Sequence, residues 1–213
     1  VFTSDLSIQL AKEQCEILGI KYSFISIEGI NDAISESLKD RFNGLPNDIT
    51  EENIQARSRG LILMSISNKT GKILLTTGNK SELAVGYSTL YGDMAGSFAP
   101  LKDIYKTDVY NLSRYRNSIS SVIPEAVIDR MPTAELAQDQ YDIDTLPQYD
   151  VLDNILKSFI EEKKSLEEIC SMGHELNLVS NIINMVIKNE YKRRQYAPGV
   201  KVSSESFGRD RRF

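Results

Sequence analysis

The chain has 213 residues, of which 41% are hydrophobic and 26% are charged, so it is long enough for one α/β domain and unlike a disordered or fibrous protein. Its apolar runs fall short of the roughly 18 residues that a membrane span needs, so we expect no membrane partner and no signal peptide. The net charge of −5 argues against nucleic-acid binding, and the widely separated Cys15 and Cys170 form no disulfide framework, which predicts a cytoplasmic protein.

The first part of the chain alternates between helical and strand-like patterns. Residues 4–19 have the spacing of an amphipathic helix that Ser4 can cap, and residues 21–27 (KYSFISI) alternate as in a strand. Further helices are predicted over 31–42 and over 50–67.

An apolar run at 72–77 (KILLTT) is typical of a strand buried in a parallel sheet. The order helix, turn, strand predicts an α/β fold, a Rossmann-like doubly wound parallel sheet with helices on both faces. Because no low-complexity linker interrupts the pattern, we expect a single domain over residues 1–213.

The second half is mainly helical apart from the acidic, irregular stretch 131–147. Helices are predicted over 107–117, 150–162 and 178–192. Ser165–Glu168 has the pattern of a capping box, which predicts a further helix start.

The C-terminal tail is basic. Residues 188–213 contain eight Lys/Arg and three Asp/Glu, a net charge of +5, which leaves −10 for residues 1–187. Such a tail is either an anion-binding arm or a solvated end, and its aromatic, proline and glycine residues favour an ordered segment. The cations that either close over an anionic ligand or form surface ion pairs are Lys192, Arg193, Arg194, Arg209, Arg211 and Arg212.

The sequence lacks the residue patterns of several common metal sites and enzyme classes. His174 is the one histidine, and together with Cys170 it provides two of the four ligands that a structural zinc site needs. The sequence contains no G-x-S-x-G, no Walker P-loop and no G-x-G-x-x-G. Hydrolase, P-loop NTPase and classical dinucleotide oxidoreductase functions are therefore disfavoured.

The segment Thr77–Glu82 (TGNKSE) follows the predicted strand 72–77, where open α/β sheets bind their ligands. Gly78 permits close backbone approach to an anion, and Glu82 could hold a magnesium ion. The alternative is an ordinary strand-to-helix turn with Ser81 as the cap, and spacing alone does not decide between them.

Further candidates follow downstream. Tyr87–Asp93 is a polar-aromatic loop that suits either stacking of a ring or packing, and Asp93 is either an oxygen ligand or a turn residue. Lys102, Lys106 and Arg114 lie on or near one helix, where they form either a solvated basic face or a phosphate contact.

Four blocks of the sequence resemble NAD⁺ synthetases of the ATP-pyrophosphatase superfamily. They are Glu51–Gly60, Thr77–Lys106, Pro132–Leu156 and Asn189–Phe213, in the order of that family. Tyr191 and the GRDRRF ending look more like the glutamine-dependent branch than the ammonia-dependent one.

The resemblance implies a Rossmann-like fold, a homodimer or larger assembly, and use of ATP with Mg²⁺. ATP would adenylylate the carboxylate of nicotinic acid adenine dinucleotide (deamido-NAD⁺), and ammonia from glutamine would then give NAD⁺ and AMP. By motif position, the residues near ATP would be Thr77, Lys106 and Thr133. Those near deamido-NAD⁺ would be Asn53, Arg57, Glu82 and Lys192, with Glu82 also matching a Mg²⁺ position of short members.

Two departures from the family pattern matter. Leu90 and Ser97 stand where short members have lysine and aspartate, which again favours the longer branch. The signature SGGxDS is absent from the 213 residues, so we expect Val1–Gly19 to begin just past it, without the preceding glutaminase domain, and the chain alone to be inactive. The alternatives are a non-catalytic fragment that binds dinucleotide, or another ATP-pyrophosphatase such as a GMP synthetase.

Overall fold

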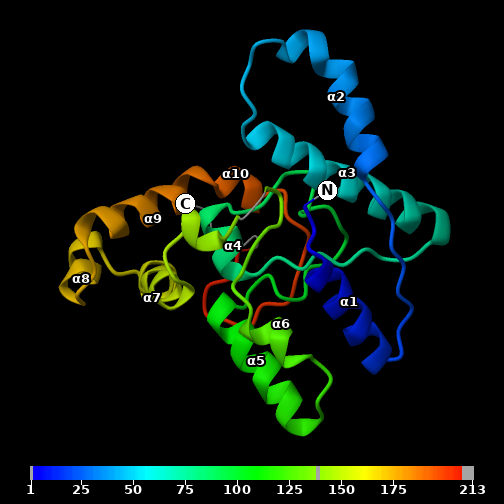
Figure 1. The fold of residues 1–213 in the computed structure, drawn as a ribbon. Helices are drawn as coiled ribbons and strands as arrows, with labels where there is room; N and C mark the ends of the chain where they lie inside the picture. The colour runs from blue at the N-terminus through cyan, green and yellow to red at the C-terminus, as the bar shows by residue number, and fades with distance from the viewer. Residues whose placement is uncertain (1, 138–139, 208–213) are drawn as a thin grey trace.

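The computed structural model describes residues 2–137 and 140–207, so Arg209, Arg211 and Arg212 lie outside the described residues. Helices joined by long loops make up the described chain (Figure 1). Their bounds are α1 Asp5–Ile17, α2 Glu28–Phe42, α3 Ile49–Thr70, α4 Lys80–Val85, α5 Lys106–Ile119, α6 Glu125–Asp129, η1 Asp142–Asp144, α7 Tyr149–Ile160, α8 Leu166–Ser171, α9 Leu176–Lys188 and α10 Glu190–Arg193. Within the described residues, none of these helices could cross a bilayer.

Side-chain caps set the starts of α1, α3 and α8, close to where the sequence predicted them. The Ser7 amide donates to the Ser4 hydroxyl at 3.2 Å and starts α1, as predicted. The predicted box at Ser165–Glu168 is present and starts α8. The helix predicted from Thr50 is α3, but Asp48 is its cap.

The predicted sheet is not found among the described residues. Residues 21–27 and 72–77 form no regular strand, and the β pairing described is one isolated parallel bridge between Leu75 and Phe98. Phe24 is 65% exposed, so this segment has no covering layer in the described structure. A strand needs a partner for its backbone N–H and C=O groups, and composition alone does not provide one.

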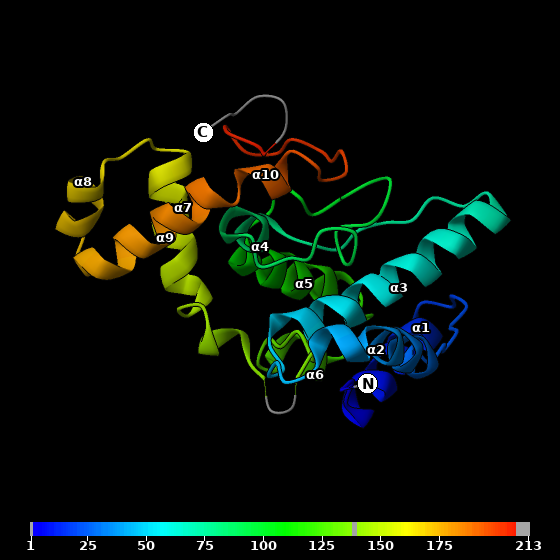
Figure 2. The ribbon, with the colours of Figure 1, turned by 90° about the horizontal axis from the view of Figure 1, so that it is seen from above.

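The hydrophobic core lies where α7 and α9 pack against each other and against the short α4. In both views α4 and α5 lie between α7–α9 on one side and α1–α3 on the other (Figures 1 and 2). The spacing predicted for 150–162 and 178–192 is confirmed by the fully or almost fully buried side chains Leu152, Ile155, Leu156, Ile160, Val179, Ile182 and Val186.

Residues 196–207 form a segment that we call the C-terminal strap, which packs along residues 99–103. The Ala99 amide donates to the carbonyl of Pro198 at 2.9 Å, and Lys102 donates to the carbonyl of Ala197 at 3.0 Å. This part of the tail is therefore held to the rest of the domain by these contacts, and it brings the end of the described chain next to α4.

The glycine that ends α4 gives a stability prediction. Gly86 has φ +73°, and a Cβ there would lie 2.1 Å from Cγ of Asn189, whose amide donates to the carbonyl of Val85 at 2.9 Å. We expect Gly86→Ala to lower the free energy of unfolding by about 2 kcal/mol, from left-handed strain plus displacement of Asn189.

The matched control is Gly71, which ends α3 with φ +67° and has open space around its Cβ position. Gly71→Ala should show the strain alone, about 1 kcal/mol in urea denaturation. Equal losses for the two variants would show that Asn189 yields without penalty.

Candidate functional site

A pocket of about 580 Å³ opens between α3, α4, α5, α10 and the loop that follows α6. Five of the seven predicted site residues line it although they come from separate parts of the chain, namely Asn53, Glu82, Lys106, Thr133 and Lys192. Cations and carboxylates are interspersed around its wall, so it suits a ligand that carries both phosphates and polar groups.

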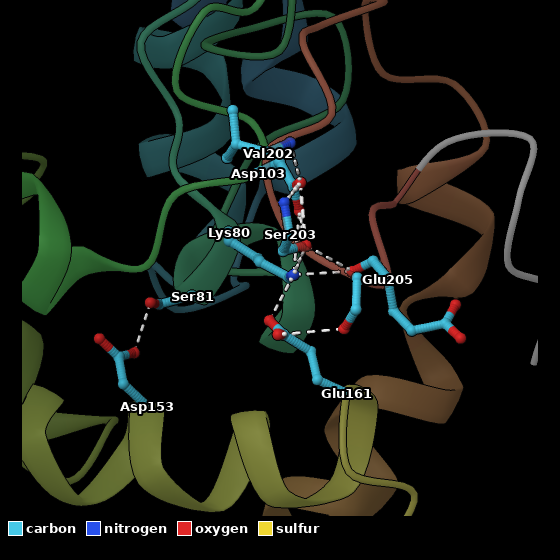
Figure 3. A network of polar contacts seen from close by, with 9 residues as sticks. Lys80, Ser81, Asp103, Asp153, Glu161, Val202, Ser203 and Glu205 are labelled. Carbon is cyan, nitrogen blue, oxygen red and sulfur yellow. Dashed lines mark hydrogen bonds and ion pairs between the residues drawn. The ribbon is translucent and has the colours of Figure 1, made fainter.

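The turn at Asn79–Glu82 is held by a capping box. The Asn79 side chain accepts from the Glu82 amide at 3.0 Å, and the Glu82 carboxylate accepts from the Asn79 amide at 3.2 Å. The cap is therefore Asn79 rather than Ser81, because Ser81 donates instead to Asp153 on α7 (Figure 3). The six-residue helix α4 is fixed locally by this capping box and by the C-cap at Gly86.

Lys106 and Glu82 form the central ion pair of the pocket. Nζ of Lys106 lies 3.2 Å from Oε1 of Glu82 and 5.3 Å from the ring centroid of Tyr149, and both charged side chains are 20% exposed. Burial opposes the charged form, but the carboxylates of Glu82 and Asp142 outweigh it and raise the pKa of Lys106 above its ordinary value. Lys106 is therefore a permanent cation at neutral pH.

Lys192 and Asn53 lie on the rim near the loop 86–93. Lys192 donates to the carbonyls of Gly86 and Ser88, both at 2.7 Å, and burial lowers the pKa of Lys192. Oδ1 of Asn53 accepts from the Thr89 hydroxyl at 2.9 Å. These contacts fix the loop and keep the ammonium of Lys192 on the pocket wall.

Thr133 belongs to the acidic stretch, which folds onto α3. Its hydroxyl donates to the carbonyl of Gln140 and accepts from the amide of Glu135. The Gln140 side chain in turn donates to Glu52 of α3 at 3.2 Å. Thr133 therefore reaches the pocket as part of a structured loop.

Thr77 and Arg57 are not brought to this pocket. Thr77 is exposed and lies outside the pocket lining. Arg57 is also exposed, donates from Nε to the carbonyl of Leu90 at 3.2 Å, and lines a second cavity of about 570 Å³ on the other side of α3. Their predicted ligand roles stay predictions.

The remaining candidate residues from the sequence mostly make structural contacts. Asp93 is a turn residue that accepts from the Thr89 amide at 2.6 Å, although it also borders the pocket. Lys102 is buried as an anchor of the C-terminal strap, and Arg114 is exposed on α5. Arg194 pairs with Glu190 at 2.6 Å within its own helix.

Glu82 does not provide a magnesium site by itself. One of its oxygens is paired with Lys106 and the other accepts from the Asn79 amide. Among residues 2–137 and 140–207 no group of three or more His, Cys, Asp or Glu side chains could hold a metal, so a magnesium ion at Glu82 would need most of its oxygen ligands from phosphates and water. Glu82 is better described as the counter-ion of Lys106. Nε2 of His174 lies 2.9 Å from Oδ1 of Asn154.

Asp153 and Tyr149 hold the site together and were not found from the sequence. Arg193, predicted to close over an anionic ligand or to form a surface ion pair, has a buried structural place. The buried Asp153 accepts from Ser81 and Thr107, and Tyr149 donates to Asp142 at 2.7 Å. Burial and the nearby carboxylates raise the pKa of Tyr149, so it remains a donor. Arg193 is buried and donates to the carbonyl of Ala84 at 2.7 Å and to that of Val186. Nothing in the basic run KRR (192–194) indicates that its middle residue would be buried.

Residues 1–196 match the model of the family described as NAD synthase. The chain is 50% identical to glutamine-dependent NAD(+) synthetases of Xylella fastidiosa (strain 9a5c) and Thermotoga maritima, covering 100% of this chain but 39% and 37% of theirs. A glutamine-dependent NAD⁺ synthetase of Acinetobacter baumannii, solved with adenosine diphosphate, matches with a TM-score of 0.61 and 46% identity over 100% of this chain and 38% of that one. The NMN synthetase of Francisella tularensis matches with a TM-score of 0.75 and 25% identity over 91% of this chain and 72% of that one.

Proposed function

Because the chain belongs to the NAD synthase family, we propose that it carries the ATP-dependent amidation of deamido-NAD⁺ to NAD⁺. The chain spans 39% of the length of the relative from Xylella fastidiosa, so the source of ammonia belongs to the proposal as well. Glutamine, hydrolysed by a glutaminase part of the same protein, is the source that the names of these relatives favour.

The proposed reaction has two steps. A carboxylate oxygen of the pyridine ring attacks the α-phosphorus of ATP, and pyrophosphate leaves. Ammonia then attacks the acyl-adenylate carbon, loses its extra proton, and AMP leaves with the electron pair of the broken C–O bond. Orientation and charge neutralisation supply most of the rate for such steps, so a general-base histidine is not needed.

The pocket is the observation that carries the proposal. It gathers five residues that motif position assigns to ATP or deamido-NAD⁺, from segments as distant as α3 and α10. We assign Lys106 and Thr133 to the phosphates of ATP, and Asn53, Glu82 and Lys192 to the acid dinucleotide. Magnesium would have to be held mainly by the phosphates themselves, since Glu82 is engaged by Lys106.

The deciding experiment follows the products in the natural full-length protein. With ATP, ammonia and deamido-NAD⁺ we expect equal amounts of NAD⁺ and AMP. With xanthosine monophosphate in place of the dinucleotide we expect no AMP. AMP from the xanthine nucleotide would favour a GMP synthetase instead, and dinucleotide binding without AMP would favour a non-catalytic module. Gel filtration of the same protein tests the homodimer that we also propose.

Lys192 gives a prediction on substrate specificity. Because its ammonium lies on the pocket wall beside the loop 86–88, we expect Lys192→Ala to raise KM for deamido-NAD⁺ by roughly tenfold, as expected for one charged hydrogen-bonding group. KM for ATP should change less than threefold. Steady-state kinetics with each substrate varied in turn decides, and equal effects on both KM values would contradict the assignment.

A further inference from the structure

Lys80, the first residue of α4, has a completely buried ammonium group. Its side chain is 0% exposed, and Nζ lies 2.9 Å from Oδ1 of Asp103 and 2.9 Å from Oε1 of Glu161. It also donates to the Ser203 hydroxyl and to the carbonyl of Glu205, both at 2.7 Å (Figure 3). The three protons of an ammonium are therefore fully used, and a buried cation is tolerated only when it is paired in this way.

Two aromatic rings complete the surroundings of Lys80. Its Nζ lies 4.8 Å from the ring centroid of Tyr105 and 5.9 Å from that of Phe207, distances at which a cation is attracted to the ring face. One ring precedes α5 and the other belongs to the C-terminal strap. A single side chain thus joins four segments, namely α4, the loop 101–105, the end of α7 and the strap 196–207.

Asp103 is the second centre of this cluster. Its carboxylate accepts from the amides of Val202 and Ser203 at 2.8 and 2.7 Å. Burial opposes ionisation, but these amides and Lys80 outweigh it and hold the pKa of Asp103 below its ordinary value. The carboxylate therefore stays charged at neutral pH and keeps the strap bound to the loop.

The cluster is connected to the pocket by short backbone links. The Lys80 amide donates to the carbonyl of Ile104 at 2.8 Å, and the Lys106 amide donates to the hydroxyl of Ser81 at 2.9 Å. Lys106 then reaches Glu82 through its own ammonium at 3.2 Å. Loop 101–105 therefore connects the buried ammonium of Lys80 to the Lys106–Glu82 ion pair of the pocket.

We propose that Lys80 is a positioning residue, whose buried ammonium locks the C-terminal strap and the loop 101–105 onto α4 and thereby sets the place of Lys106 in the pocket. Lys80 itself lies outside the pocket lining, so it acts on the ligand through Lys106. The effect on catalysis rests on the proposed function, whereas the effect on the strap does not.

The test compares Lys80→Met with the wild type in the natural full-length protein. Hydrogen exchange at the amides of 103–106 and 202–205 should accelerate by at least about tenfold. In the variant the free energy of local opening is lower, because the strap can separate from the loop without breaking the ion pairs of Lys80. Exchange in α9 should stay unchanged. In kinetics, KM for ATP should rise about tenfold through misplacement of Lys106, whereas partial unfolding alone would lower kcat and leave KM as it was.

Lys163→Met is the matched control, because Lys163 also binds the strap, at 3.0 Å from Glu205, but from an exposed side chain. It should leave both exchange and KM as in the wild type. If Lys80→Met does not fold, Ser203→Ala removes one partner of Lys80 and leaves each buried charge with its counter-ion, and we expect the same changes at about threefold.

Unchanged exchange at 103–106, or faster exchange with unchanged KM for ATP, would overturn the positioning role. A wild type that forms no NAD⁺ would instead refute the proposed function, and the exchange experiment would still decide whether Lys80 holds the strap.

Discussion

Lys106→Met is expected to lower kcat/KM for ATP in the proposed NAD⁺-forming reaction by about 10²- to 10³-fold, the usual loss when one preorganised donor to a developing charge is removed. Lys106 is the cation of the central ion pair, and its raised pKa keeps it charged at every pH near neutrality. Methionine keeps the length of the apolar stem and removes the ammonium, which lies 5.9 Å and 5.3 Å from the ring centroids of Tyr110 and Tyr149. The loss should therefore reflect the missing charge.

Arg114→Met is the matched control for Lys106→Met. Arg114 is a cation on the same helix and lies over the same Tyr110 ring, at 6.0 Å, but it is exposed and outside the pocket lining. Its loss should leave kcat/KM within about twofold, since a solvated surface charge is worth little. If Lys106→Met kept kcat/KM within threefold of the wild type, the assignment of Lys106 to the phosphates would be wrong.

The sequence predicted elements that depend on local chemistry. The start of α1 at Ser4, the capping box of α8 and the buried faces of α7 and α9 follow from side chains within one or two turns. The buried face of α1 was predicted less well, because Leu10 is buried but Leu6 and Ile17 are about half exposed. An apolar stripe predicts the helix, and only the neighbouring elements decide how much of it is covered.

Features that need a distant partner were missed. The apolar run 72–77 predicted a buried strand, but Ile73 is 70% exposed. Burial of such a run depends on a neighbouring strand, which the run itself does not identify. Resemblance pointed to seven residues, of which five line one pocket. Spacing did not show that Ser81, Asp153 and Lys80 would hold that pocket in place. The contact of Ser81 with Asp153 joins residues 72 positions apart, and that of Lys80 with Glu161 joins residues 81 positions apart, where no local rule applies.

Asp153 holds α4 and α5 to α7 through a single buried carboxylate. It is 6% exposed, accepts from the hydroxyl of Ser81, and accepts from the amide and hydroxyl of Thr107 at 2.9 and 2.8 Å. Burial raises the pKa of Asp153 and these three donors oppose that shift. The carboxylate of Asp153 is thus the shared hydrogen-bond acceptor of Ser81 and Thr107, which directly follow Lys80 and Lys106 in the chain.

Asp153→Ala should lower the free energy of unfolding by about 4 kcal/mol, because three buried donors lose their acceptor and each unsatisfied group costs about 1–3 kcal/mol, with partial compensation. Asp153→Asn keeps the volume and one acceptor oxygen but turns a donor toward Thr107, so it should cost about 2 kcal/mol. Asp150→Ala, at an exposed position in the first turn of the same helix, is the control and should cost less than about 1 kcal/mol. Urea denaturation measures all three. Losses for Asp153→Ala no larger than for Asp150→Ala would mean that Ser81 and Thr107 find other acceptors, and that the place of Lys106 is set by the Lys80 cluster alone.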